Sequence, residues 1–334
     1  MAQMAAELGL SPGAVSSVLN GRAKQARISE STVQRVREHL TQRGYVPSRH
    51  ACHLREAPAR VIGILYVGEL LSSHLVEGFH KLVGLLGNDT QGLEICMTPL
   101  GPVEAAVRDL LARRVTDLVW VNNNSQGGEQ YRWGSISQYL RNTRTIIYNY
   151  PFDSPFGEKE LLDRGVALVG VDRTAQNRRL AIFLKQLGHS VIALPDIPDG
   201  ELYKNYFETF ASVGLKVAVC PPSFTAEGML KVMKDQGVTA ACFHGDNPAS
   251  MAIWRLREVG VRVPEDLTVM GFDGMSKSYY PDLTTQAIPV GKMVAKVGEL
   301  IAGTERELSH CFDLELVEGR THGTPRGENL SLTT

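Results

Sequence analysis

Two patterns of hydrophobic positions divide the chain near residue 60. Before it, apolar side chains recur at helical spacing in three short stretches. From Val61 onward, short apolar runs typical of buried strands alternate with longer amphipathic stretches typical of helices. The pattern predicts a small all-α head followed by an α/β body, in which helices cover both faces of parallel sheets.

Local signals set the expected helix ends in the head. Gly9 ends the first helix, Ser11 is placed to cap the second, and Pro12 suits its first turn because a helix needs no N–H there. Ser29 is placed to cap a third helix that stops at Gly44. A helix, a short glycine turn and a capped second helix predict a helix-turn-helix.

The body reads as two successive sets of strands and helices. VIGILYV begins the first set and VALVGVD opens the second, so we expect a two-lobed body with chain crossings near 150–166 and 281–290. The predicted domains are a helix-turn-helix at 1–46, a hinge at 47–60 and an effector-binding, dimerisation domain at 61–334, with lobe 1 at about 61–150 and 285–308 and lobe 2 at about 151–284 and 309–334.

Charge separates the head from the body. Residues 1–60 carry nine Lys or Arg against four Asp or Glu, whereas the other residues carry 26 against 32. A basic head on an acidic body indicates that the head meets a polyanion and the body does not. Chance clustering of surface charge is the alternative.

Composition narrows the class of protein. The 334 residues are 43% hydrophobic and 21% charged, which is typical of a folded globular chain. No apolar run reaches the roughly 20 residues that span a bilayer, and the N-terminus lacks the pattern of a signal peptide, so we expect a cytoplasmic protein. The five cysteines are scattered, without a CxxC pair, which favours idle thiols in a reducing compartment.

Enzyme motifs are missing from the sequence. It contains no GxSxG, no HExxH and no P-loop, and its nine histidines do not follow metal-ligand spacing. We therefore expect a protein that is not an enzyme and that needs neither cofactor nor metal.

Three segments carry a family resemblance. MAAELGLSPGAVSSVLNG with RISESTVQRVREHLTQRGYVPS in the head, and VPEDLTVMGFDG and LTTQAIPV far downstream, resemble the lactose/galactose repressor (LacI/GalR) family over essentially the full length. The resemblance implies a periplasmic-binding-protein-like body and a DNA-binding regulator, usually a repressor. It also implies a homodimer on a pseudo-palindromic operator, controlled by a small effector between the lobes.

The resemblance further implies which residues meet DNA. The second helix would lie in the major groove, with base edges read by Pro12, Gly13 and Ser17 and phosphates faced by Ser11, Ser16 and Asn20. In the hinge, Leu54 would wedge into the minor groove while Arg49, His50, His53 and Arg55 meet phosphates; the alternative is that Leu54 packs against the body. Gly13 and Ser17 cannot read guanine or adenine bidentately, so operator choice would rest on the hinge and on DNA shape.

Polar residues at strand ends are the candidate effector ligands, because ligands in such sheets bind at the carboxyl ends of strands. These residues are Asn149, Tyr150, Asp172, His244, Asp246 and Asp273. Asp273 in GFDG matches the family aspartate that holds an effector hydroxyl or amine. Asp172 and Asp246 each precede a predicted helix, so helix capping is the alternative role for both.

Three further candidates come from helix starts. The stretch ELLSSHLVEG offers Ser72 and His74, and Lys204 imperfectly replaces an arginine for which this chain has Leu202. Without that arginine clamp, a carboxylate or phosphate effector is less expected than a sugar or polyol, and a degenerate pocket is the other alternative.

One competing function comes from another class of protein. A periplasmic-type solute-binding protein would share the two-lobed body, but it would need a signal peptide and no basic head. The tail after Val317 has no heptad repeat, which favours a dimer over a tetramer built by the tail.

Overall fold

A computed structural model describes the chain over residues 2–19, 22–43, 60–67, 73–88, 92–98, 103–122, 139–140, 142–153, 157–194, 201–218, 224–275 and 280–325. These residues fall into two compact units, residues 1–59 and residues 60–334. Expectations for Asn20, for the hinge residues Arg49, His50, His53, Leu54 and Arg55, and for Ser72 lie outside the described residues.

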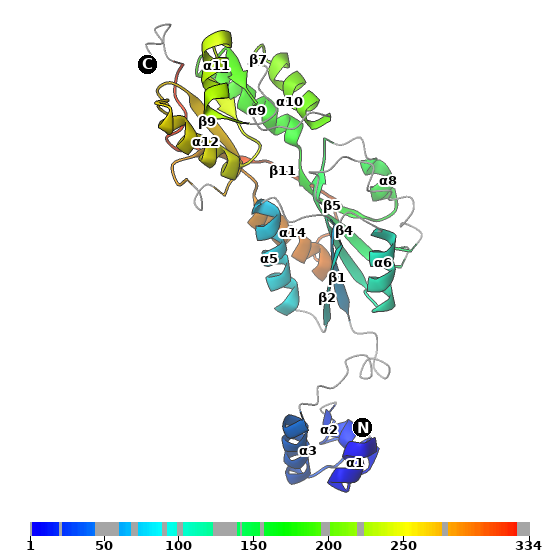
Figure 1. Cartoon of the computed structure of the whole chain (residues 1–334). Coiled ribbons are helices and arrows are strands. Elements are labelled where there is room, and N and C mark those ends of the chain that lie inside the picture. Colours follow the sequence, from blue (N-terminus) through cyan, green and yellow to red (C-terminus); the bar gives the residue numbers. More distant parts are fainter. Residues whose placement is uncertain are drawn as a thin grey trace. The chain divides into compact units, whose positions relative to one another are not determined.

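Three helices form the described part of the first unit: α1 (Ala2–Leu8), α2 (Pro12–Leu19) and α3 (Glu30–Arg43) (Figure 1). Gly9 has φ +66°, the left-handed conformation that ends a helix at little cost. Ser11 Oγ accepts a hydrogen bond from Ala14 N at 3.1 Å, and Ser29 Oγ accepts one from Thr32 N at 3.3 Å. Both predicted caps are therefore confirmed.

A small apolar core holds these helices together. Its fully buried members are Ala5, Val15, Val18 and Val36. Two polar contacts tie α3 to α1: Arg35 Nη2 donates to Leu8 O at 3.0 Å, and His39 Nε2 lies 2.9 Å from Glu7 Oε2. So small a core depends on such contacts for its stability.

The first sheet of the second unit has the strand order β11-β5-β4-β3-β1-β2. Its strands are β1 (Val61–Val67), β2 (Gly92–Thr98), β3 (Asp117–Val121), β4 (Arg144–Pro151), β5 (Ala167–Val171) and β11 (Ser309–Phe312). Every neighbouring pair is parallel. Both faces are covered: α5 (Ser73–Asn88) and α14 (Val290–Ala302) lie on one, and α6 (Val103–Ala112) and α8 (Glu158–Asp163) on the other.

The second sheet has the strand order β12-β10-β9-β8-β6-β7. Its strands are β6 (Val191–Ala193), β7 (Lys216–Ala218), β8 (Ala240–Cys242), β9 (Thr268–Asp273), β10 (Thr284–Ala287) and β12 (Glu315–Val317). Only β12 is antiparallel among the described pairs. The helices α9 (Arg173–Gln186) and α10 (Glu201–Ser212) cover one face, and α11 (Ala226–Gln236) and α12 (Asp246–Glu258) the other.

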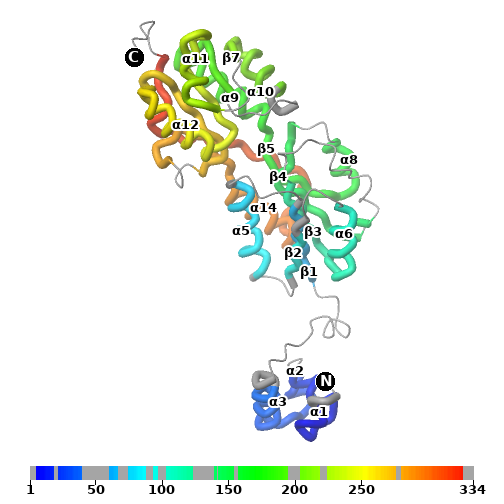
Figure 2. Tube along the Cα trace, viewed as in Figure 1, coloured from blue at the N-terminus to red at the C-terminus, as the bar shows by residue number. Residues whose placement is uncertain are grey.

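The two-lobed α/β body is thus as predicted, but the expected lobe limits differ from the observed sheets. Strand β5, expected to open lobe 2, belongs to the first sheet, and so does β11. Strand β10, of which residues 285–287 were expected in lobe 1, belongs to the second sheet. The late, orange to red part of the chain accordingly runs through both sheets (Figure 2). An apolar strand is compatible with either sheet, so its own pattern does not say which one it joins.

One residue ties together the three places where the chain passes between the sheets. The chain passes from the first sheet to the second after β5, back after β10, and over again after β11. Gln176, next to the first of these crossings, donates through Nε2 to Asp313 Oδ1, in the third crossing, at 3.0 Å. Its main-chain oxygen accepts from Gln286 Nε2 at 3.1 Å beside the second. Arg179 adds an ion pair to Asp313 at 2.9 Å. The crossings therefore form one hydrogen-bonded unit.

No described helix combines the length and the apolar character that crossing a bilayer would demand.

Candidate functional site

Polar side chains stand in a row at the carboxyl ends of adjacent strands of the first sheet. Asn149 is the extra residue of a β-bulge in β4, because Tyr148 pairs with Val169 and Tyr150 already pairs with Gly170. Its φ of +63° is in the left-handed region, which asparagine tolerates better than most residues. A Cβ at Gly170 would overlap the Tyr150 carbonyl oxygen, so the bulge requires glycine there.

The bulge fixes the Asn149 side chain. Asn149 Nδ2 donates to Asn122 O at 2.8 Å, and Asn122 Nδ2 donates back to Asn149 O at 3.2 Å. The remaining side-chain atom, Asn149 Oδ1, accepts from Arg173 Nη2 at 3.5 Å. The ends of β3, β4 and β5 are thereby joined by one polar network.

His74 lies in the first turn of α5 at the same edge. It is buried, and burial, together with the nearby charge of Arg173, lowers the pKa of His74 to about 3. The imidazole is therefore neutral at physiological pH. Neither ring nitrogen has a hydrogen-bond partner in the described part of the chain.

The second sheet places two carboxyl groups together at its own carboxyl edge. Asp246 is the first residue of α12 after β8, and Asp273 ends the neighbouring strand β9. Asp246 is fully buried, and its Oδ1 accepts from Thr285 Oγ1 at 2.5 Å. Gly271 makes room for it, since a Cβ there would overlap Asp246 Oδ1. Capping, the alternative role for Asp246, is not observed, because the cap residue is Gly245.

Asp273 has an unusual backbone and an unusual protonation. Its φ of +100° is costly for any residue with a Cβ. Its Oδ1 accepts from Met275 N at 3.1 Å. Burial, and next the charge of Asp246, raise the pKa of Asp273 to about 8. The two acids therefore share a proton at neutral pH, and strain and perturbed protonation coincide at this predicted ligand.

The other candidate effector residues have mixed outcomes. Asp172 caps α9, because its side chain accepts from Ala175 N at 2.8 Å, so its alternative role is the observed one. Tyr150 is buried and its ring packs edge-on against Phe152. Lys204 and His244 are exposed. Among the described residues, no hydrogen bond or ion pair joins Lys204 to Asn149, His74 or the acid pair.

Arg173 and Thr285 were missed by the sequence analysis, although both touch candidate residues. Arg173 directly follows Asp172 at a strand end, so position alone could have marked it. The family resemblance implied a cation at the start of α10 instead, where this chain has Leu202 in place of an arginine. Thr285 lies inside a strand, and only the fold brings it to Asp246.

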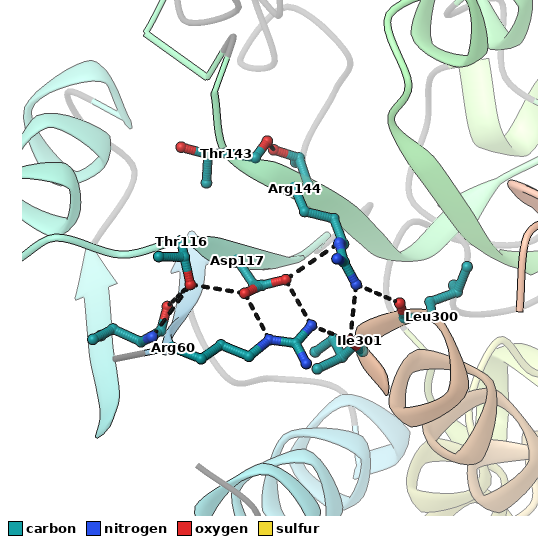
Figure 3. Close-up of polar contacts among 9 residues, drawn as sticks. Arg60, Thr116, Asp117, Thr143, Arg144, Leu300 and Ile301 are labelled. Atoms are coloured by element: carbon teal, nitrogen blue, oxygen red, sulfur yellow. Dashed lines mark hydrogen bonds and ion pairs between the residues drawn. The ribbon is translucent and has the colours of Figure 1, made fainter. Parts of the chain in front are cut away.

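A cluster of charges anchors the first residue of the body (Figure 3). Arg60 forms a bidentate pair with Asp117, with Nε to Oδ2 and Nη2 to Oδ1 both at 3.0 Å. Arg144 Nε lies 3.4 Å from Asp117 Oδ1. Thr116 Oγ1 donates to Asp117 Oδ2 at 2.8 Å. The cluster lies at the amino ends of β1, β3 and β4, the edge opposite to the polar row.

The same arginines reach the end of α14. Arg144 Nη1 donates to Leu300 O at 2.9 Å and to Ile301 O at 2.8 Å, and Arg60 Nη2 also donates to Ile301 O. Cations are favourable beside the unpaired carbonyls of a helix C-terminus. Burial acts to raise the pKa of Asp117, but hydrogen bonds from Arg60 and Thr116 and the two guanidinium charges outweigh it, so the pKa lies below its usual value.

The start of α2 presents part of the predicted DNA-reading surface. Ser11, Pro12 and Gly13 are exposed, and Ser17 is half-exposed with its Oγ donating to Gly13 O at 2.9 Å. Ser16, which was expected to face a phosphate, is buried, so it offers little surface for that contact.

Comparison with known proteins extends over the head and the body. A model of the periplasmic binding protein-like domain matches residues 167–318. The HTH-type transcriptional repressor PurR of Aliivibrio salmonicida is 27% identical over 311 residues, 85% of this chain and 86% of the relative. A LacI family transcriptional regulator from Silicibacter pomeroyi superposes with a TM-score of 0.70 at 18% identity, over 95% of this chain and 97% of its own.

The chain is similar to regulators of the LacI/GalR family over most of its length. Among solved structures, the lac repressor dimer bound to operator and to the anti-inducer ONPF shares its fold, with a TM-score of 0.66 at 21% identity over 96% of this chain and 98% of that one. This similarity agrees with the two-sheet body, which has polar residues at the carboxyl ends of both sheets.

Proposed function

We propose that this protein is a sequence-specific DNA-binding transcriptional repressor of the cytoplasm, controlled by a small polar effector. The observation that carries the proposal is the reach of the sequence matches, since the HTH-type transcriptional regulator Rv3575c of Mycobacterium tuberculosis matches over 97% of this chain at 26% identity. A protein that shares only a ligand-binding body with the repressors would match over the body alone. The basic head and the acidic body agree with this division of labour.

The head acts as a helix-turn-helix. Helix α2 enters the major groove with Pro12, Gly13 and Ser17 toward the bases and with Ser11 toward a phosphate. None of these side chains pairs bidentately with guanine or adenine. Two copies therefore select a pseudo-palindromic operator mainly through the spacing of half-sites and through DNA shape. Leu54 of each hinge wedges into the minor groove, with phosphates met by Asn20, Arg49, His53 and Arg55.

The effector binds between the carboxyl edges of the two sheets. The acid pair binds hydroxyl groups of the effector. The ionised carboxylate of the pair accepts hydrogen bonds, and the protonated acid donates one. Asn149 and His74 contribute from the first sheet, and Ser72, Tyr150, Lys204 and His244 remain candidates for outer contacts. These groups suit a sugar or a related polar metabolite.

Exposed apolar side chains support a homodimer. Met251 and Trp254 on α12 are 48% and 59% exposed, and Ile95 lies on β2, the edge strand of the first sheet. Large apolar side chains that are exposed, here in the parts of the body built on each of the two sheets, are typical of a surface that a partner covers. The partner we infer is a second copy of the chain.

Binding-site selection from a random duplex library tests the proposed function. The full chain should enrich a two-fold symmetric motif, and its affinity for that motif should fall steeply with salt. A chain of residues 60–334, which keeps Arg60 and the whole second unit, should enrich nothing. Equal enrichment by both chains would place DNA binding outside the head and refute the proposal. A solute-binding protein, the alternative function, would enrich no motif in either form.

Met251→Glu tests the dimer. A charge on an apolar face that a partner covers is left buried and unpaired, so self-association should weaken at least tenfold. Sedimentation velocity at micromolar concentration measures the change. Ile182→Glu on α9, where Ile182 is 40% exposed, is the matched control and should leave the dimer unchanged. Identical sedimentation of the two variants would show that α12 is not in the interface.

A further inference from the structure

At the carboxyl edge of the first sheet lies a guanidinium that has no carboxylate partner among the described residues. Arg173 is half-buried, and among the described residues its only hydrogen bond goes to the neutral acceptor Asn149 Oδ1, at the long distance of 3.5 Å. No carboxylate forms an ion pair with it within the described ranges. By contrast, Arg60, at the opposite edge of the sheet, is paired with Asp117. Partial burial of an arginine is costly unless a counter-charge arrives.

A second group at this edge also has no hydrogen-bond partner among the residues that the structure describes. His74 is more than nine-tenths buried and feels the charge of Arg173, yet neither of its ring nitrogens is hydrogen-bonded in the part of the chain that the structure describes. A neutral imidazole carries one N–H donor whatever its tautomer. An acceptor placed beside Arg173 would satisfy this donor as well.

The two helices that carry these residues add to the positive potential. His74 lies in the first turn of the 16-residue helix α5, and Arg173 in the first turn of the 14-residue helix α9, so both helix N-termini are at this edge. The nearby carboxylates already have partners: Asp172 accepts from Ala175 N, and Asp153 accepts from Thr174 Oγ1 at 3.2 Å. Neither is paired with Arg173.

We infer that Arg173, His74 and Asn149 form a subsite for an anionic group of the effector. Arg173 supplies the counter-charge with a planar pair of donors, His74 supplies a neutral donor, and Asn149 holds the guanidinium in place. The effector class is therefore a small hydroxylated molecule that carries a carboxylate or a phosphoryl group. The expected sugar or related polar metabolite is thereby narrowed to one that carries an anionic group, bound by Arg173 rather than by the arginine that Leu202 replaces. The inference rests on the proposed function only in calling this ligand an effector.

Thermal unfolding of the full chain with four probes tests the subsite. The probes are inorganic phosphate, gluconate, glucose 6-phosphate and glucose, at constant ionic strength. We expect at least one of the three anions to raise the unfolding temperature saturably, and glucose to act at least tenfold more weakly. A ligand that binds only the folded chain produces such a shift by mass action.

Variants locate the effect. Arg173→Gln should lower the affinity for the anion at least tenfold, and His74→Leu should lower it about fivefold. His74→Gln keeps a hydrogen-bond donor, so it should lower the affinity less than His74→Leu does. Arg178→Gln is the matched control, because Arg178 is exposed on the same helix. The inference is overturned if no anion protects the wild-type chain, or if Arg173→Gln responds as the wild type does. DNA-motif enrichment without any probe is scored separately. Its loss would refute the proposed function and leave the anion site standing.

Discussion

Asp117→Asn is expected to lower the free energy of unfolding of the body by about 2–4 kcal/mol, the range for breaking a buried ion pair, reduced for partners that water can reach. Asp117 is buried, whereas the side chains of Arg60 and Arg144 are 39% and 48% exposed. Without the carboxylate, two guanidinium groups face each other across a neutral amide. The amino ends of three strands lose their common partner.

Urea unfolding of the full chain measures this change, with Asp163→Asn on the exposed end of α8 as control. The pH dependence has a definite sign. Because the pKa of Asp117 is lowered in the folded state, its contribution is complete above its unfolded pKa of about 4 and is lost as pH falls through the folded value. The free energies of unfolding of the variant and the wild type should thus converge once the pH falls below the folded pKa of Asp117. If the Asp117→Asn chain were as stable as the Asp163→Asn chain at pH 7, the charge cluster around Asp117 would not stabilise the body.

Asp273→Asn is expected to stabilise the protein at alkaline pH. The folded chain holds a proton on Asp273 up to about pH 8, whereas the unfolded chain releases it near pH 4. Stability therefore decreases as pH rises through this window and levels off above it. Asparagine removes the titration and can still accept from Met275 N. At pH 9 the free energy of unfolding of the variant should exceed that of the wild type by about 2–4 kcal/mol. The upper limit is about 5 kcal/mol, because the folded and unfolded pKa values of Asp273 differ by about four units.

Urea unfolding at pH 5, 7 and 9 measures the effect, with Asp235→Asn, exposed on α11, as control. The gain should be small at pH 5 and largest at pH 9. A wild-type stability that does not change between pH 5 and pH 9 would show that the acid pair releases its proton without cost. A site that sacrifices stability in this way is common where binding requires it.

Much of the body could be predicted because its strands are buried on both faces. Continuous apolar runs such as Val61–Val67 and residues 118–121 of β3 leave few alternatives to a parallel sheet. The assignment of strands to sheets could not be predicted in the same way. Strand β5 is as apolar as its neighbours, and its place beside β4 depends on tertiary packing. Helix α14 was missed although Val290, Met293, Val294, Val297, Leu300 and Ile301 recur at helical spacing and are buried.

The candidate site divides along a similar line. The two acids could be singled out as candidates, because ligands bind at the carboxyl ends of parallel strands; Asp273 ends β9 and Asp246 comes shortly after β8. The role of Arg173 could not, because it depends on which groups lie near its guanidinium. Asp117 drew no attention because it begins a strand rather than ending one. Its two arginine partners are 57 and 27 residues away in the chain, and only the register of β1, β3 and β4 aligns them.

Helix α14 has one consequence for communication within the body. Ile288 N, just before the helix, donates to Asp273 O at 3.3 Å, and the last carbonyls of the helix accept from Arg60 and Arg144. At 1.5 Å per residue, its 13 residues span about 20 Å. A single stiff helix thus connects the backbone of Asp273, in the acid pair, with Arg60, the first residue of the body. A displacement at one end reaches the other without having to pass through a loop.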